Sequence, residues 1–307
     1  MRRVWYGEHG GPEVLQVEEV DVPSPGPGEV LLEVDAVGVT LPGLFHLRDL
    51  ELPQRPGGEL AGRVVAVGDG VEGFAVGQRV AGLTMSGAMA DYAVAPAALL
   101  DVVPEDVPPV IAMALLRSGQ VALAALELAR LQPGDSVLVT AAAGGVGHLA
   151  VQLAKSLGAG RVVGTVSDAS KAEFVRRQGA DEVVLSNEAR WPVEVDVVVE
   201  GVGGVVLERA LQCVKPFGRL ITLSAAPGRL ASHDLLTGLR TVTGLSMGQV
   251  ARNRPDLIGT WRRQLWTLLA TGQVRPAIAA ELSLEEAAKA YQLLADRANQ
   301  GKVTLVP

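Results

Sequence analysis

Residues 137 to 147 read Val-Leu-Val-Thr-Ala-Ala-Ala-Gly-Gly-Val-Gly, an apolar strand that leads directly into a glycine-rich turn. Apolar residues then recur at helical spacing up to Gly158, which is placed to end a helix. Strand, tight turn and helix open a dinucleotide-binding α/β domain. Gly144, Gly145 and Gly147 leave the backbone bare at the helix amino terminus, where a diphosphate accepts hydrogen bonds from N–H groups.

The segments after this turn alternate between strand and helix patterns. Strands are expected at 161–166, 182–185, 195–199, 219–223 and 241–246, with a helix at 171–178. A doubly wound parallel sheet requires this alternation. The glycine motif alone also fits an ordinary turn of an α/β protein, but the alternation favours a Rossmann domain.

The remainder of the chain predicts a second, β-rich domain into which the Rossmann domain is inserted. Short strands are expected at 30–39, 60–68, 79–83 and 88–94, followed by a helix at 119–131. Two helices, 256–270 and 284–295, precede a last strand at 302–306, and Ser283 with Glu286 forms a capping box for the second helix. The predicted domains are residues 1–115, 116–255 and 256–307, the last returning to the first.

Composition limits the classes of partner. The formal net charge is −7 and no run of Lys or Arg occurs, which argues against nucleic acid. A single cysteine excludes an internal disulfide and a multi-cysteine zinc site, and Cys213 is expected in the core. The apolar run 110–116 stops at Arg117, short of membrane-spanning length, so a cytoplasmic protein without a membrane partner is expected.

Several short motifs carry a resemblance over nearly the whole chain. They are residues 10–15, Gly57-x-Glu59-x-x-Gly62-x-Val64, 77–80, 87–92, 141–147, Gly164-Thr165, 201–204 and 301–303. In this order and spacing the chain resembles the zeta-crystallin-like, zinc-independent quinone oxidoreductases of the medium-chain dehydrogenase/reductase superfamily. The resemblance implies a GroES-like catalytic domain, a Rossmann domain and NADPH-dependent reduction of quinones or activated double bonds. It also implies dimers or tetramers, and we expect a homodimer.

Two positions argue against catalytic zinc. Gly58 stands where the zinc-dependent branch has a metal-binding histidine, and Thr40 lies near the position of its ligand cysteine. Quinones and polarised enones suit such a site, because their own conjugation stabilises negative charge without a Lewis acid. Thr40 is the candidate catalytic residue, as a donor to a carbonyl oxygen. Its alternative role is a β-branched residue that fills a strand end.

The choice between NADPH and NADH depends on residues after the second Rossmann strand. Asp168 either holds an NAD ribose or caps the next helix, where Ser170 with Glu173 is a competing cap. By resemblance, Ser167 and Lys171 contact a 2′-phosphate, which favours NADPH, and Ser186 stands where close relatives carry a tyrosine that packs on that phosphate. Lys171 is alternatively a solvated lysine of the helix. The resemblance further assigns cofactor contacts to Gly144, Gly145, Val146, Gly147, Val202, Leu223 and Lys302.

The substrate side departs from the family pattern. Thr40, Gly43 and Val121 stand where relatives carry Asn, Asp and Thr. One alternative to a quinone reductase is an enoyl or alkenal double-bond reductase, since polyketide enoyl reductase domains have much the same glycine loop. The losses at these three positions support another, a NADPH-binding sensor or structural protein with little or no catalysis. His46 is expected to be a surface or packing residue, with a proton donor to a reduced quinone as the alternative, and His148 is expected on a helix face. Phe45, Met85 and Met89 suit either core packing or an apolar wall for a planar acceptor.

Overall fold

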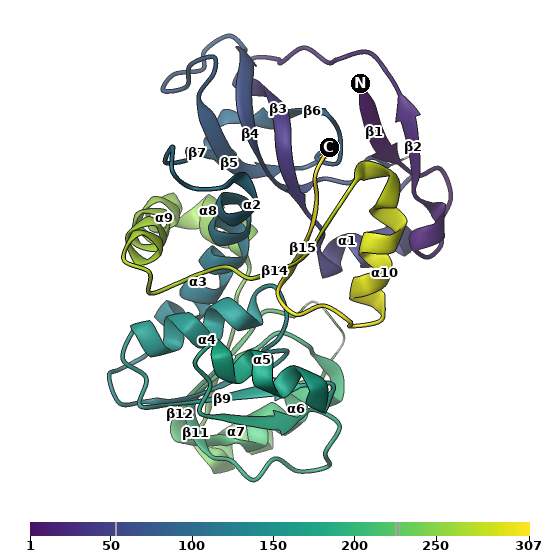
Figure 1. Cartoon of the computed structure of the whole chain (residues 1–307). Helices are drawn as coiled ribbons and strands as arrows, with labels where there is room; N and C mark the ends of the chain where they lie inside the picture. The colour runs from purple at the N-terminus through teal and green to yellow at the C-terminus, as the bar shows by residue number, and fades with distance from the viewer. Residues whose placement is uncertain (53, 225, 227) are drawn as a thin grey trace. The chain divides into compact units, whose positions relative to one another are not determined.

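The computed structural model describes residues 1–52, 54–224, 226 and 228–307. The chain divides into two compact units (Figure 1). Unit 1 comprises Met1–Arg117 and Ala277–Pro307, and unit 2 comprises Ser118–Pro276. The segment predicted to form the Rossmann domain is therefore inserted into the sequence of the β-rich unit, which the C-terminal segment completes.

Unit 1 is built around a mainly antiparallel sheet with the order β14-β15-β3-β4-β5-β7, and β6 also pairs with β3. A separate antiparallel pair joins β1 to β2. The strands are β1 (Arg2–Trp5), β2 (Gln16–Glu19), β3 (Glu29–Gly38), β4 (Gly58–Val67), β5 (Arg79–Thr84), β6 (Tyr92–Pro96), β7 (Leu100–Val102), β14 (Ile278–Leu282) and β15 (Lys302–Leu305), and the helices are α1 (Leu41–Asp49), α2 (Pro109–Ala114) and α10 (Ala287–Ala295).

The C-terminal segment is tied into this sheet by β15, which runs antiparallel to β3. The Val39 N–H donates to the Val303 carbonyl at 3.0 Å, and in Figure 1 the yellow β15 lies beside the purple β3. The predicted capping box of Ser283 and Glu286 is present before α10. The strand predicted at 88–94 was placed too early, because residues 88 and 91 donate to the Pro56 and Arg2 carbonyls instead.

Unit 2 contains a parallel sheet with the order β10-β9-β8-β11-β12-β13. This is the doubly wound order, whose direction reverses between β8 and β11. The strands are β8 (Ser136–Val139), β9 (Arg161–Val166), β10 (Glu182–Leu185), β11 (Val195–Glu200), β12 (Val214–Thr222) and β13 (Thr241–Gly244), and the helices are α3 (Gln120–Leu128), α4 (Gly147–Ser156), α5 (Ala172–Arg177), α6 (Gly204–Gln212), α7 (Ser232–Gly238), α8 (Met247–Asn253) and α9 (Pro255–Ala270).

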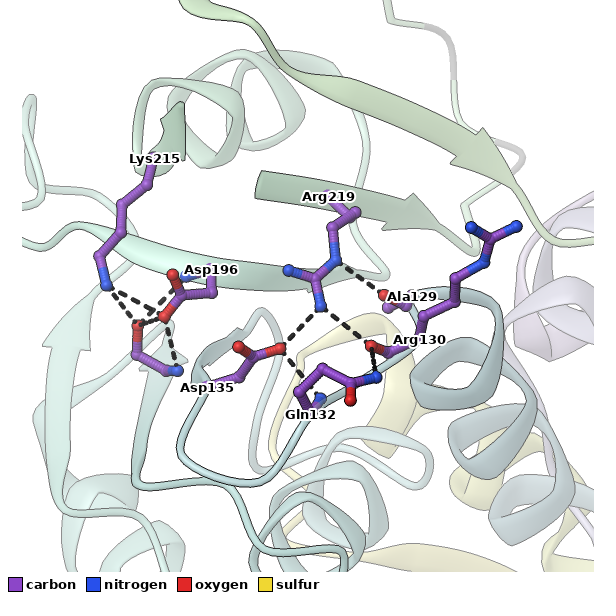
Figure 2. Close-up of polar contacts among 8 residues, drawn as sticks. Ala129, Arg130, Gln132, Asp135, Asp196, Lys215 and Arg219 are labelled. Carbon is purple, nitrogen blue, oxygen red and sulfur yellow. Dashed lines mark hydrogen bonds and ion pairs between the residues drawn. The ribbon is translucent and has the colours of Figure 1, made fainter. Parts of the chain in front are cut away.

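Polar contacts at the start of β8 and β11 fix the register of the central strands (Figure 2). Asp196 accepts hydrogen bonds from the Ser136 N–H at 2.8 Å and from the Lys215 ammonium at 3.0 Å. Burial alone would raise the pKa of Asp196, but these partners lower it to about 2. Arg219 similarly pairs with Asp135 at 2.7 Å. Cys213 lies in the adjoining core, as predicted, and burial raises the pKa of its thiol to about 11.

Unit 2 extends beyond the boundary predicted at residue 255. The Gln120 side chain donates to the Ile258 carbonyl of α9 at 3.2 Å, which ties α9 to α3. The Arg275 N–H donates to the Gln152 side chain of α4 at 2.7 Å. The observed unit consequently ends at Pro276, because α9 and the segment after it pack on the Rossmann helices.

The helix predicted at 119–131 is part of a longer helical run, Pro109–Leu128, with one π-helical turn at Leu115–Gly119. Pro109 suits a helix start, and Arg117 does not interrupt the run. Within the described residues, this run alone is long and apolar enough to cross a membrane by length and composition. Of the apolar 18-residue stretch within this run, 72% is buried inside the protein, as in the core helix of a globular protein.

Candidate functional site

The glycine-rich turn between β8 and α4 needs small residues on both of its sides. A Cβ at Gly147 would overlap the Ala141 carbonyl and lie 2.8 Å from the Ala142 Cα, so only glycine fits there. Ala142 occupies the position where the commoner motif has its first glycine. Gly164 of β9 accommodates it, since a Cβ at Gly164 would lie only 2.9 Å from the Ala142 Cβ.

The amino terminus of α4 presents unpaired backbone donors. The N–H groups of Gly145, Val146 and Gly147 donate to no backbone or side-chain acceptor in the described part of the chain. The helix is ten residues long, and its dipole places partial positive charge at this end. Bare backbone, free donors and the dipole together suit a diphosphate.

A buried carboxylate organises the neighbouring loop at the carboxyl end of β11. The Glu200 Oε1 accepts from the N–H groups of Val202 at 2.6 Å and Gly203 at 2.7 Å, and its Oε2 accepts from the Thr222 hydroxyl at 3.1 Å. The Leu223 N–H donates to the Glu200 carbonyl at 2.7 Å. Glu200 therefore links Val202 and Leu223, two predicted cofactor residues, at one edge of the sheet.

Glu200 was missed by the sequence analysis. Its side chain is fully buried, and its carboxylate uses local backbone donors. The available signal was an acidic residue that follows Val197-Val198-Val199 and precedes Gly201-Val202-Gly203-Gly204. At that position a carboxylate can accept hydrogen bonds from the N–H groups of the following turn.

The residues predicted for the 2′-phosphate lie after β9 and β10. The Ser186 N–H donates to the Val166 carbonyl at 2.8 Å, which places Ser186 beside the end of β9 where Ser167 is exposed. Lys171 is buried in the turn that follows Ser167. The structure thus gathers Ser167, Lys171 and Ser186 at the carboxyl ends of these neighbouring strands.

Asp168 forms the helix cap that was one of its two predicted roles. Its Oδ1 accepts from the Ser170 N–H at 2.8 Å, and hydrogen bonding to Ser170 keeps the pKa of Asp168 below its usual range. The competing cap by Ser170 and Glu173 is absent, since a 3₁₀ turn at Ala169–Lys171 delays the start of α5 to Ala172. Asp168 remains exposed at the sheet edge.

His148 lies on helix α4, as predicted, and its side chain is fully buried behind the glycine-rich turn. Its Nδ1 donates to the Gly144 carbonyl at 2.8 Å, and its ring centroid lies 6.3 Å from that of Phe174. Because the acceptor is a carbonyl, Nδ1 carries the proton of the neutral ring. Burial lowers the pKa of His148 to about 4, so the ring is neutral at pH 7.

In unit 1, Thr40 follows β3 and caps α1. Its Oγ1 accepts from the Gly43 N–H at 3.2 Å, which leaves the hydroxyl proton for another acceptor. Gly43 lies against Tyr291, and a Cβ there would be 2.5 Å from the tyrosine oxygen. An aspartate at position 43 would therefore require Tyr291, which is fully buried, to move.

The three apolar residues considered as a wall for a planar acceptor differ in their burial. Met89 belongs to the core, whereas Phe45 is 43% exposed and Met85 is 82% exposed. His46 is exposed, as predicted, and its carbonyl accepts from the Tyr6 hydroxyl at 3.0 Å. Core packing therefore explains Met89 but neither Phe45 nor Met85.

Lys302 is buried in unit 1 beside Glu59. The ammonium forms an ion pair with the Glu59 Oε1, and the two side chains are 5% and 0% exposed. Neither Glu59 oxygen accepts a hydrogen bond from any other described residue. Burial lowers the pKa of Lys302. The side chain of Glu59 packs against Gly38, where a Cβ would overlap the carboxylate.

Comparison with known proteins agrees with this architecture. Residues 26–105 match the alcohol dehydrogenase GroES-like domain, and residues 145–270 match the zinc-binding dehydrogenase family. A quinone oxidoreductase of Pseudomonas aeruginosa is 33% identical, covering 100% of this chain and 99% of the relative. A 2-haloacrylate reductase of a Burkholderia species is 32% identical, covering 97% and 96%. The Escherichia coli quinone oxidoreductase, crystallised with NADPH, has a TM-score of 0.92 and 28% identity over all of both chains.

A GroES-like unit with an inserted Rossmann unit defines a medium-chain dehydrogenase/reductase, as the sequence motifs indicated. Within that class of oxidoreductases, the chain belongs to the quinone oxidoreductase family. The resemblance and the fold class proposed from the sequence are both confirmed.

Proposed function

We propose that the protein transfers a hydride from NADPH to a quinone or a similar conjugated carbonyl acceptor. The observation that carries this proposal is the amino terminus of α4, where Gly145, Val146 and Gly147 present unpaired donors in a chain of the quinone oxidoreductase family. Relatives crystallised with NADPH support the choice of nucleotide.

The chain's contribution is mainly binding and orientation. Bound NADPH supplies the hydride. The backbone donors of residues 145–147 hold its diphosphate, and the turn organised by Glu200 contacts it through Val202 and Leu223. Ser167, Lys171 and Ser186 hold its 2′-phosphate, with the lysine supplying a positive charge. The Thr40 hydroxyl donates a hydrogen bond to the acceptor oxygen, on which negative charge develops, and solvent supplies the proton that completes the reduction. Lys302 remains a predicted cofactor contact, which requires its ammonium to leave Glu59.

The proposed reaction is independent of zinc. Gly58 replaces the metal-binding histidine, Thr40 is engaged as a helix cap, and Glu59 is paired with Lys302. No three His, Cys, Asp or Glu side chains within the described ranges are arranged to hold a metal. This donor set does not fit catalytic zinc. We further propose a cytoplasmic homodimer with no membrane or nucleic-acid partner.

The proposal is tested by the absorbance of NADPH during incubation with 1,4-benzoquinone or 1,4-naphthoquinone. We expect oxidation of NADPH above the uncatalysed rate, and tighter binding of NADPH than of NADH by calorimetry. Absence of turnover across a broad panel of quinones and enones would refute the proposed activity. Tight NADPH binding without any oxidation would instead support a sensor or structural protein.

A double-bond reductase is the second candidate, because a 2-haloacrylate reductase is 32% identical over nearly the whole chain. Its acceptors are also conjugated, so the same binding of NADPH serves both reactions. Competition between a 2-enone and a quinone separates them: the acceptor with the higher kcat/KM identifies the preferred class.

Replacing the candidate donor, Thr40→Val, is expected to lower kcat/KM for quinones about tenfold, the equivalent of one lost hydrogen bond. The variant also loses the cap on α1, so Thr40→Ser, which keeps both the hydroxyl and the cap, is the control. Steady-state kinetics and melting temperatures of both variants give the comparison. Full activity of Thr40→Val would exclude Thr40 as the donor.

A further inference from the structure

The Gly144 carbonyl accepts two hydrogen bonds from one residue of α4. The His148 N–H donates to it at 3.1 Å and the His148 Nδ1 at 2.8 Å. The imidazole is fully buried and lies against Phe174 at a ring angle of 45°, so its orientation is fixed. The buried imidazole thus holds the Gly144 carbonyl of the glycine-rich turn by a hydrogen bond of 2.8 Å.

The peptide bond that joins Gly144 to Gly145 connects this contact to the diphosphate donors. In a planar trans peptide, the C=O and the following N–H point in opposite directions. The carbonyl of Gly144 is held towards the helix by His148. The Gly145 N–H, which has no acceptor among the described residues, must therefore point away from the helix body.

We propose that His148 is a positioning residue for cofactor binding. By holding the Gly144 carbonyl, its side chain aims the Gly145 N–H at the diphosphate of NADPH. Glycines on either side leave this peptide otherwise free to rotate, which is why a second hydrogen bond to its carbonyl matters. The inference rests on the proposed function, since it concerns the same nucleotide site.

The test compares two variants of His148 in the full chain. His148→Leu removes the side-chain donor but keeps an apolar side chain, whereas His148→Asn retains an N–H that reaches the carbonyl four residues earlier. Binding of NADPH and of adenosine 2′-monophosphate, which lacks the diphosphate, is measured by calorimetry. We expect His148→Leu to bind NADPH five- to tenfold more weakly, about the effect of one hydrogen bond, and His148→Asn to remain within about twofold of the wild type.

Binding of adenosine 2′-monophosphate is expected to be unchanged in both variants, because the altered peptide lies at the diphosphate. The matched control is Gln152→Leu, which removes a hydrogen-bonding side chain one turn further along α4 without touching the glycine-rich turn. It should leave NADPH affinity unchanged even if it lowers the melting temperature.

Three outcomes overturn the inference. The first is wild-type NADPH affinity in His148→Leu, and the second is an equal loss of affinity for NADPH and adenosine 2′-monophosphate in that variant. The third is a loss of NADPH affinity in Gln152→Leu as large as in His148→Leu. If His148→Leu does not fold, ¹⁵N NMR of the wild-type imidazole is the test. The proposal requires that Nδ1 carries the proton and that this proton exchanges slowly with water, and a proton on Nε2 instead would overturn it. A wild type that binds no NADPH refutes the proposed function itself, which is a different result.

Discussion

Alanine at position 147 is expected to weaken NADPH binding about 100-fold. Its Cβ would overlap the Ala141 carbonyl and approach the Ala142 Cα to 2.8 Å, and both are backbone atoms that cannot rotate away. The turn must shift, which misaligns the donors of residues 145–147. Loss of two charge-assisted hydrogen bonds, at about 1.5 kcal/mol each, corresponds to this factor.

Calorimetry with NADPH measures the effect of Gly147→Ala, and circular dichroism checks that the variant is folded. The matched control is Gly259→Ala in α9, where the nearest atom to the new Cβ is a flexible Arg263 nitrogen at 3.4 Å. That change should leave affinity intact and stabilise the helix by about 0.5–1 kcal/mol. Unaltered NADPH affinity in Gly147→Ala would show that the turn is not the diphosphate site.

Breaking the buried ion pair in unit 1 is expected to cost the most stability. Either Glu59→Met or Lys302→Met leaves its partner's charge buried without compensation, which typically costs about 3–5 kcal/mol. The double variant removes both charges and replaces them with apolar side chains of similar length. It should regain most of the loss, because a buried ion pair is itself offset by the cost of desolvation.

Hydrogen exchange of peptides from β4 and β15 is the suitable measurement, since the two compact units need not unfold together. Faster exchange should appear in both single variants and largely disappear in the double variant. Arg254→Met is the control: its pair with Asp256 is about 60% exposed on both sides, and no measurable change is expected. If the double variant is as unstable as the single ones, the packing of Glu59 and Lys302, rather than their charges, accounts for their contribution to stability.

The same variants address the predicted contact between Lys302 and the cofactor. In the double variant the native unit is restored without the ammonium. A clear loss of NADPH affinity there supports the cofactor contact, because stability no longer explains it. Unchanged affinity means that the lysine serves the ion pair alone.

Local patterns in the sequence were sufficient for most of the nucleotide-binding unit. The strand, glycine-rich turn and helix at 137–158, the alternation of strands and helices after them and the capping box at Ser283 all depend on neighbouring residues, whose spacing is visible in one dimension. Likewise, the residues Ser167 and Lys171 follow β9 directly. The sequence was weaker at boundaries, as with the strand now placed at Tyr92–Pro96, because long-range partners decide where a strand begins.

By itself, then, the sequence determined the class of fold, the geometry of the glycine-rich turn and the family. Only the tertiary structure decided what the isolated polar residues do. Glu59 and Lys302 are 243 positions apart, and pairing requires the chain to return through β15 to the first sheet. His148 and Glu200 became interpretable through burial, because a polar group removed from water must find a partner, and that partner is set by packing rather than by spacing.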